Sequence, residues 1–192
     1  MPSLAVFQWL LQQSSTPASG ILDLGLADYN PTVLQLVTLP NLLLSWAQVT
    51  NTGSWEAEGE LEIDSEVINR FMESLKAQSV SLSFYSGAWC PEFVALVSQR
   101  SQSSCGKLMV VGAETIYSPA ALASFGEALM SLLGQQSTEG IALIAAKKVY
   151  FGVGGSMEDF CDLVRAKGAG VEQIREESDG VRRAVVEVKI LP

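Results

Sequence analysis

The sequence predicts a three-layer α/β domain with a mostly parallel sheet, and three observations support that fold class. Short apolar runs suited to buried strands alternate with stretches whose apolar residues have helical spacing. The chain has 192 residues, the length of one domain, and we expect residues 1–192 to fold around one core. Hydrophobic residues make up 48% and charged residues 17%, a composition typical of globular proteins.

Helical spacing of apolar residues, with proline or serine at the entry, marks the expected helices. They cover residues 2–13, 31–39, 41–46, 65–78, 93–98, 119–133 and 157–167. Pro31 presets the first turn of the second helix, and Pro40 is expected to break it because proline lacks a backbone N–H. The helix at 65–78 is amphipathic, and its expected core-facing residues are Val67, Ile68, Phe71, Met72 and Leu75.

Continuous apolar runs, or alternation of apolar and polar residues, mark the expected strands. They cover residues 21–27, 80–85, 108–113, 141–150, 171–174 and 181–190. Residues 50–62 are polar and carry glycine, so we expect an exposed excursion there. Parallel sheets bind ligands at the carboxyl ends of their strands, so the residues just after each run are the candidates for a site.

The residue types present exclude several kinds of chemistry. Histidine is absent, so hydrolase triads with a histidine base, the usual histidine-containing zinc sites and histidine acid–base catalysis are unavailable within this chain. Cys90, Cys105 and Cys161 lack the spacing of a disulfide framework or of a C-x-x-C metal pair. We therefore expect reduced thiols and no metal site.

Charge and hydropathy point to an intracellular, soluble protein without a membrane or nucleic-acid partner. The net charge is −9, from 21 acidic and 12 basic residues, and no local basic stripe is visible that would attract a phosphate backbone. A basic partner suits such a surface better. No uninterrupted apolar run approaches the roughly 18 residues that cross a bilayer, and the N-terminus lacks the basic stretch of a signal peptide.

Carboxylates and aromatic residues follow the expected strands. The segments concerned are 28–30, 86–89, 114–117 and 151–155. Asp28 suits a ribose, because an ionised carboxylate accepts hydrogen bonds from two hydroxyls, but it also suits a helix cap ahead of Pro31. Trp89 suits the face of an adenine or simple core packing.

Two glycine-bearing stretches suggest cofactor turns, and each is incomplete. I-L-D-L-G opens like a nucleotide-cofactor fingerprint, but no second glycine follows Gly25. In F-G-V-G-G-S-M, Met157 replaces the last glycine of the dinucleotide pattern, and no acid ends a strand about 20 residues further on. A substrate-side loop is the preferred interpretation of the second stretch, and a phosphate-binding turn of a nicotinamide-dependent oxidoreductase is the alternative.

Four segments taken together resemble one family, the eukaryotic protein-histidine N-methyltransferases. They are L-A-D-Y-N-P-T-V-L-Q-L-V-T-L-P-N, F-Y-S-G-A-W, G-A-E-T-I-Y-S-P and A-A-K-K-V-Y-F-G-V-G-G. The resemblance covers nearly the whole chain and implies a Rossmann-like class I methyltransferase fold. It also implies S-adenosyl-L-methionine as cofactor, and as substrate a histidine-bearing, basic protein of the large ribosomal subunit. The implied location is the cytoplasm, with the nucleus as a second.

The resemblance further implies roles for the residues at the strand ends. The cofactor-binding residues would be Asp28, Tyr29, Asn30 and Trp89, with Asp28 on the ribose and Trp89 against the adenine. The catalytic residues would be Glu114, Thr115 and Tyr117. The substrate-binding residues would be Tyr150, Phe151, Gly154 and Gly155.

The resemblance also implies that this chain begins after the family's first strand and its glycine-rich cofactor loop. The start M-P-S-L resembles the opening of the helix that follows that loop, so 21–27 would be the second strand. Because the first strand is central in the family's sheet, its neighbours would have unpaired edges, and we expect poor solubility or oligomerisation. A catalytically inactive, protein-binding module is the alternative function.

Overall fold

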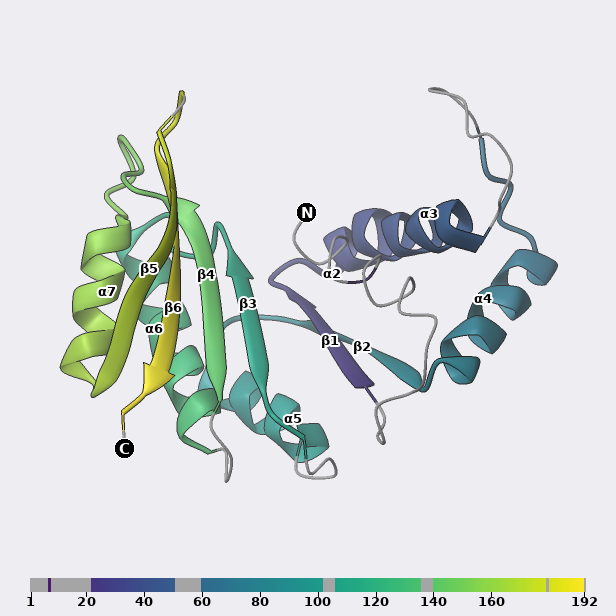
Figure 1. Ribbon diagram of the computed structural model, residues 1–192, viewed down its shortest axis with the longest axis horizontal. Helices are drawn as coiled ribbons and strands as arrows, with labels where there is room; N and C mark the ends of the chain where they lie inside the picture. Colours follow the sequence, from purple (N-terminus) through teal and green to yellow (C-terminus); the bar gives the residue numbers. More distant parts are fainter. Residues whose placement is uncertain are drawn as a thin grey trace. The chain divides into compact units, whose positions relative to one another are not determined.

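The computed structural model describes residues 7, 22–50, 60–101, 106–135, 140–178 and 180–191. The chain forms two compact units, Met1–Gly87 and Ala88–Pro192, and each is described by itself (Figure 1). The expectation of one domain over 1–192 stays a prediction. The expected helix at 2–13 lies outside the described residues apart from Phe7, which is helical and fully buried. Most of the expected excursion, residues 51–59, lies outside them too.

The first unit contains a two-stranded parallel sheet. β1 (Leu22–Asp28) pairs with β2 (Val80–Ser86), and both strands lie within one residue of the predicted bounds. Parallel neighbours need a crossover connection, and helices supply it. These are α2 (Pro31–Val33), the π-helix η1 (Leu34–Thr38), α3 (Leu39–Thr50) and α4 (Ser65–Ala77).

The helical run Pro31–Thr50 continues through Pro40, where a break was predicted. That prediction was wrong, and so was the separate helix at 41–46. The π-helical turn η1 ends immediately before α3, and its wider hydrogen-bond pattern accommodates a residue that has no backbone N–H. Proline near such a turn costs far less than in a regular helix interior.

The length and hydropathy of the same run bear on whether the chain could cross a membrane. Pro31–Thr50 has 20 residues and a mean hydropathy of 1.2, so by length and composition it is a candidate membrane span. The buried core helix of a globular protein passes the same test. Of its most apolar stretch, 39% is buried inside the protein.

The core of the first unit forms where α3 and α4 pack on the sheet. Trp46 meets Phe71 edge to face at 5.5 Å between ring centroids, and Leu42 and Leu75 complete the contact. Ile68 and Met72, expected in this core, are 45% and 59% exposed. Phe71 and Leu75 lie one turn apart on a single helix face, and the core stripe is too narrow to include the two residues beside them.

The second unit is built on a four-stranded sheet in the order β3-β4-β6-β5. Its strands are β3 (Met109–Ala113), β4 (Ile141–Lys147), β5 (Ala169–Glu177) and β6 (Arg183–Ile190). β3 and β4 are parallel, whereas β6 runs antiparallel to both β4 and β5. With the parallel β1–β2 pair, this confirms the predicted α/β fold: the β1–β2 and β3–β4 pairs are parallel, and the chain ends in antiparallel pairs.

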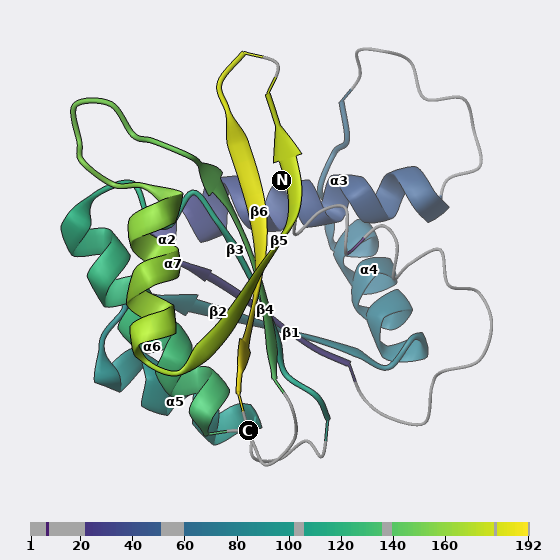
Figure 2. The same cartoon turned by 60° about the vertical axis from the view of Figure 1, so that its left-hand side comes forward.

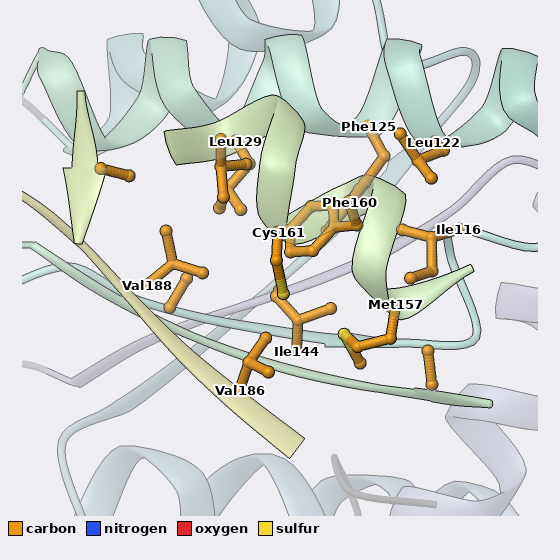
Figure 3. Packing of buried hydrophobic residues seen from close by; sticks show 14 of the residues in the cluster. Ile116, Leu122, Phe125, Leu129, Ile144, Met157, Phe160, Cys161, Val186 and Val188 are labelled. Atoms are coloured by element: carbon orange, nitrogen blue, oxygen red, sulfur yellow. The ribbon is translucent and has the colours of Figure 1, made fainter. Parts of the chain in front are cut away.

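Helices cover one face of this sheet (Figure 2). They are α5 (Pro91–Ser101), α6 (Pro119–Gly134) and α7 (Met157–Ala166). α5 is longer at both ends than the predicted 93–98. Figure 3 shows the resulting core, in which Phe160 of α7 lies between Phe125 of α6 and the strand residues Ile144 and Val186.

Two loops at the carboxyl ends of β3 and β4 lie side by side in this unit. One is 114–118, between β3 and α6, and the other is 148–156, between β4 and α7. The predicted strand 141–150 ends at Lys147, so Tyr150 belongs to the second loop. The candidate site is built on these loops.

Candidate functional site

Glu114 is the first residue after β3, and its backbone is held in an unusual conformation. Its φ of 57° lies in the left-handed region that side chains other than glycine rarely adopt. Its N–H donates to the carbonyl oxygen of Ala145 at 2.9 Å, which extends the β3–β4 pairing by one residue. The sheet therefore fixes where the Glu114 carboxylate leaves the backbone.

Tyr150 fixes the carboxylate itself. The Tyr150 side chain is only 8% exposed, and its hydroxyl donates to Glu114 Oε2 at 2.6 Å. The backbone N–H of Lys147 donates to the same hydroxyl oxygen at 3.3 Å. Burial, together with the hydrogen bond to Glu114, raises the pKa of Tyr150 well above its usual range, so the hydroxyl remains a donor at physiological pH.

Arg183 provides the second partner of the carboxylate, and the sequence analysis missed it. Its Nε lies 3.5 Å from Glu114 Oε1. Arg183 begins β6 and stands opposite Lys147 in the antiparallel β4–β6 register. The Glu114 carboxylate thus has a neutral donor on one oxygen and a cation beside the other.

Thr115 and Tyr117, the other predicted catalytic residues, follow Glu114 in the same loop. Thr115 Oγ1 is buried and has no hydrogen-bond partner in the described part of the chain, which is uncommon for a buried hydroxyl. The Tyr117 side chain is 52% exposed. Between them Ile116 is fully buried and anchors the loop in the core.

The loop 148–156 packs directly on the backbone of the Glu114 loop. A Cβ added at Gly155 would lie 2.2 Å from the carbonyl oxygen of Ile116, so only glycine fits there. The Gly155 carbonyl accepts from Tyr150 N–H at 2.9 Å. Phe151, beside Tyr150, is 91% exposed.

The glycine turn uses its own N–H groups internally. The N–H groups of Val153 and Gly154 both donate to the carbonyl of Tyr150, at 3.3 and 3.1 Å. A phosphate-cradling turn needs such groups free to face the ligand. Ser156 caps α7 by accepting from Asp159 N–H at 3.0 Å. These bonds favour the substrate-side interpretation over a nicotinamide phosphate turn.

Asp28, Tyr29 and Asn30 lie in the first unit, at the carboxyl end of β1. Asp28 Oδ1 accepts from Asn30 N–H at 2.8 Å, and Asn30 Oδ1 accepts from Thr32 N–H at 2.9 Å. The cap of α2 is therefore Asn30, not Asp28. Within the described ranges, Oδ2 of Asp28 has no hydrogen bond. Tyr29 is 70% exposed.

Trp89 contributes to the core of the second unit. Its ring meets Phe93 at 4.9 Å and Phe125 at 5.9 Å between centroids, both edge to face. The side chain is half-buried, so the core-packing interpretation accounts for part of its surface. An adenine role for the part left exposed stays a prediction.

Charges gather beside the Glu114 loop in a way that the sequence did not reveal. Glu176 of β5 accepts from Lys148 at 3.0 Å and Arg182 at 2.5 Å. These bonds, with one from Gln173, lower the pKa of Glu176 to about 2. Four of the 12 basic residues, Lys147, Lys148, Arg182 and Arg183, thus lie at one end of the β4–β6 pair. The described residues contain no cluster suited to a metal ion.

The fold and this site define an α/β protein with a fixed carboxylate at the carboxyl end of a parallel strand pair. No family model matches the chain. Histidine protein methyltransferase 1 of Saccharomyces cerevisiae is 32% identical over 179 residues, which cover 84% of this chain and 47% of the relative. The protein of the same name from Schizosaccharomyces pombe is 37% identical over 134 residues, 69% of this chain and 38% of the relative.

A histidine protein methyltransferase 1 homolog of Rattus norvegicus is 33% identical over 88% of this chain and 44% of the relative. Along the matched residues the chain is similar to the histidine protein methyltransferase 1 proteins. It spans about half the length of these curated relatives, or less. Among solved structures, the N-methyltransferase NodS of Bradyrhizobium japonicum has a TM-score of 0.39 at 11% identity, covering 100% of this chain and 98% of that one.

Proposed function

We propose that the chain acts as an S-adenosyl-L-methionine-dependent protein-histidine N-methyltransferase. The observation that carries the proposal is the Glu114 carboxylate, fixed by the Tyr150 hydroxyl at 2.6 Å at the carboxyl end of β3. The homology to proteins named histidine protein methyltransferases supports the reaction type. The carboxylate is a group that can hold an imidazole, and the relatives are named for methylation of histidine.

The reaction places modest demands on the protein. Imidazole has a pKa of about 6.5, so most of it is neutral at pH 7 and needs no strong base to become a nucleophile. A lysine amine, with a pKa of about 10.4, would cost about 4–5 kcal/mol to deprotonate at that pH. The chain contains no histidine of its own that could serve as a base, which suits a substrate that is already neutral.

Glu114 would orient the substrate. Its carboxylate would accept the N–H of one imidazole nitrogen, which would leave the lone pair of the other nitrogen free to act as the nucleophile. Tyr150 and Arg183 hold the carboxylate while it does this. Methylation would leave the ring with a proton to lose, and Glu114 would accept it.

S-adenosyl-L-methionine, when bound, supplies a methyl group on a positively charged sulfur. Asp28 fits the ribose, because Oδ2 is free of hydrogen bonds within the described ranges while Oδ1 is fixed by Asn30. Trp89 fits the adenine through the exposed part of its ring. Both assignments rest on the family resemblance and on these local contacts.

We further propose a protein of the large ribosomal subunit as the substrate, in the cytoplasm or nucleus. Such proteins are basic, and a chain of net charge −9 attracts them. The test is to incubate the chain with tritiated S-adenosyl-L-methionine and purified ribosomal subunits, then hydrolyse the labelled protein and identify the labelled amino acid. Label in methylhistidine supports the proposal, and label only in methyllysine or methylarginine contradicts it.

A protein-binding module without catalysis is the second candidate, and the exposed side chain of Phe151 favours it as much as it favours an enzyme. Calorimetric titration with S-adenosyl-L-methionine separates the two. A methyltransferase should bind S-adenosyl-L-methionine measurably, and Asp28→Asn should weaken that binding. A purely protein-binding module should not bind S-adenosyl-L-methionine.

A further inference from the structure

Exposed apolar side chains lie on the two loops that carry Glu114 and Tyr150. Phe151 is 91% exposed, Tyr117 52%, Val153 51% and Val149 50%. We call these four residues the apolar rim. Three of them alternate along the loop 148–156 with the buried Tyr150, and the fourth comes from the Glu114 loop.

The apolar rim is held in place. Val149 and Ser156 form a β-bridge across the base of the loop, and Met157 N–H donates to the Lys148 carbonyl at 3.1 Å. Gly155 is wedged against the backbone of Ile116 and Tyr117, which ties the two loops together. A phenylalanine presented to solvent on so well bonded a loop loses little conformational freedom when a partner covers it.

The apolar rim lies on the same two loops as the candidate site. Phe151 is the neighbour of Tyr150, whose hydroxyl holds Glu114, and Tyr117 lies three residues after Glu114. An extended peptide advances about 3.3 Å per residue. Because the two loops are in contact at Gly155, the residues that flank a histidine at Glu114 would lie within reach of the apolar rim.

From these observations we infer that the apolar rim recognises apolar side chains next to the target histidine in the substrate. The preferred substrate is thus a protein segment in which large aliphatic or aromatic residues flank the histidine within a few positions. The inference rests on the proposed function for the identity of the central histidine, but it concerns binding alone.

The test measures binding in the absence of S-adenosyl-L-methionine. Two short fluorescent peptides share a central histidine, flanked by leucines in one and by serines in the other, and fluorescence anisotropy follows their titration with dilute chain. We expect the leucine peptide to bind at least tenfold more tightly, a difference of about 1.4 kcal/mol. Phe151→Ser should abolish the difference, because burial of its ring supplies the preference.

Leu96→Ser is the matched control, since Leu96 is 51% exposed on α5, outside the two loops. It should leave the preference unchanged. Equal binding of both peptides, an unaltered preference in Phe151→Ser, or self-association of the chain through Phe151 in place of peptide binding would each overturn the inference. This experiment measures peptide binding and not methyl transfer. Failure of the proposed reaction would appear in the tritium-labelling experiment and can be told apart from failure of this inference.

Discussion

The hydroxyl of Tyr150 donates to Glu114 Oε2 across 2.6 Å, although the two residues are 36 positions apart in the sequence. The tyrosine is buried, whereas the carboxylate is partly open to solvent. This relationship changes the role expected of Tyr150. A side chain only 8% exposed offers little surface to a protein substrate, so its main effect is to position Glu114.

Tyr150→Phe tests that pairing. The substitution keeps the ring in the core but removes the donor, so we expect the free energy of unfolding to fall by about 1–2 kcal/mol in urea titrations. Tyr117→Phe is the control, because the Tyr117 side chain is half exposed and its loss should change stability by no more than about 0.5 kcal/mol. Equal stability of Tyr150→Phe and the unmodified chain would mean that the hydrogen bond contributes nothing.

Gly155→Ala tests the contact between the two loops. The added methyl would lie 2.2 Å from the Ile116 carbonyl oxygen, so the loops must separate, and we expect a loss of about 1–3 kcal/mol in thermal unfolding. Gly134→Ala is the matched control, because nothing lies within 4 Å of a Cβ at Gly134. If Gly155→Ala and Gly134→Ala have the same melting temperature, the two loops are not packed as described.

Glu176 makes the free energy of unfolding depend on pH in the acid range. Its folded pKa of about 2 lies below its ordinary value of 4.5, so its contribution is complete above pH 4.5 and is lost as the pH falls towards 2. In Glu176→Gln we expect a lower free energy of unfolding near neutral pH and a shallower decline of that free energy between pH 4.5 and 2. Urea denaturation at each pH measures both. Glu172→Gln, on the same strand, should follow the unmodified chain. A decline of unchanged steepness in Glu176→Gln would contradict the assignment.

The outer edge of β3 should promote self-association. Within the described residues β3 pairs with β4 alone, and it carries Met109 and Val111 at 58% and 43% exposure without a charged residue. Exposed, uncharged edge strands pair with other chains. We expect light scattering after size-exclusion chromatography to show mass that rises with concentration, and Val111→Lys to reduce it.

Leu96→Lys adds the same charge away from the sheet and should not reduce the association. A single monodisperse monomer at all concentrations would contradict this prediction. It would also remove the physical basis for expecting poor solubility.

Local patterns in the sequence were enough to predict the strands and most helices. Apolar runs such as 108–113 and 141–147 predict a strand from neighbouring residues alone. Ser156 could be predicted as a helix cap for the same reason, because its partner Asp159 is three residues away. Glu114 was found because it directly follows a strand.

Features that depend on residues far apart in the sequence could not be predicted. Arg183 reaches Glu114 only because β6 returns antiparallel beside β4, and nothing near Arg183 in the sequence indicates that. The burial of Tyr150 likewise depends on the end of β4 at Lys147, three residues earlier than its apolar pattern suggested. Helix continuity through Pro40 depended on a π-helical turn that has no sequence signature here.

The most direct test of the account is methyl transfer by the chain and by Glu114→Gln, each with tritiated S-adenosyl-L-methionine and purified ribosomal subunits. Glutamine keeps the size of the side chain but removes the charge that orients the imidazole and accepts its proton. We predict that labelled methylhistidine forms with the unmodified chain, and that turnover in Glu114→Gln falls by roughly a hundredfold while affinity for S-adenosyl-L-methionine is unchanged. Equal turnover in the two proteins would contradict a catalytic role for Glu114.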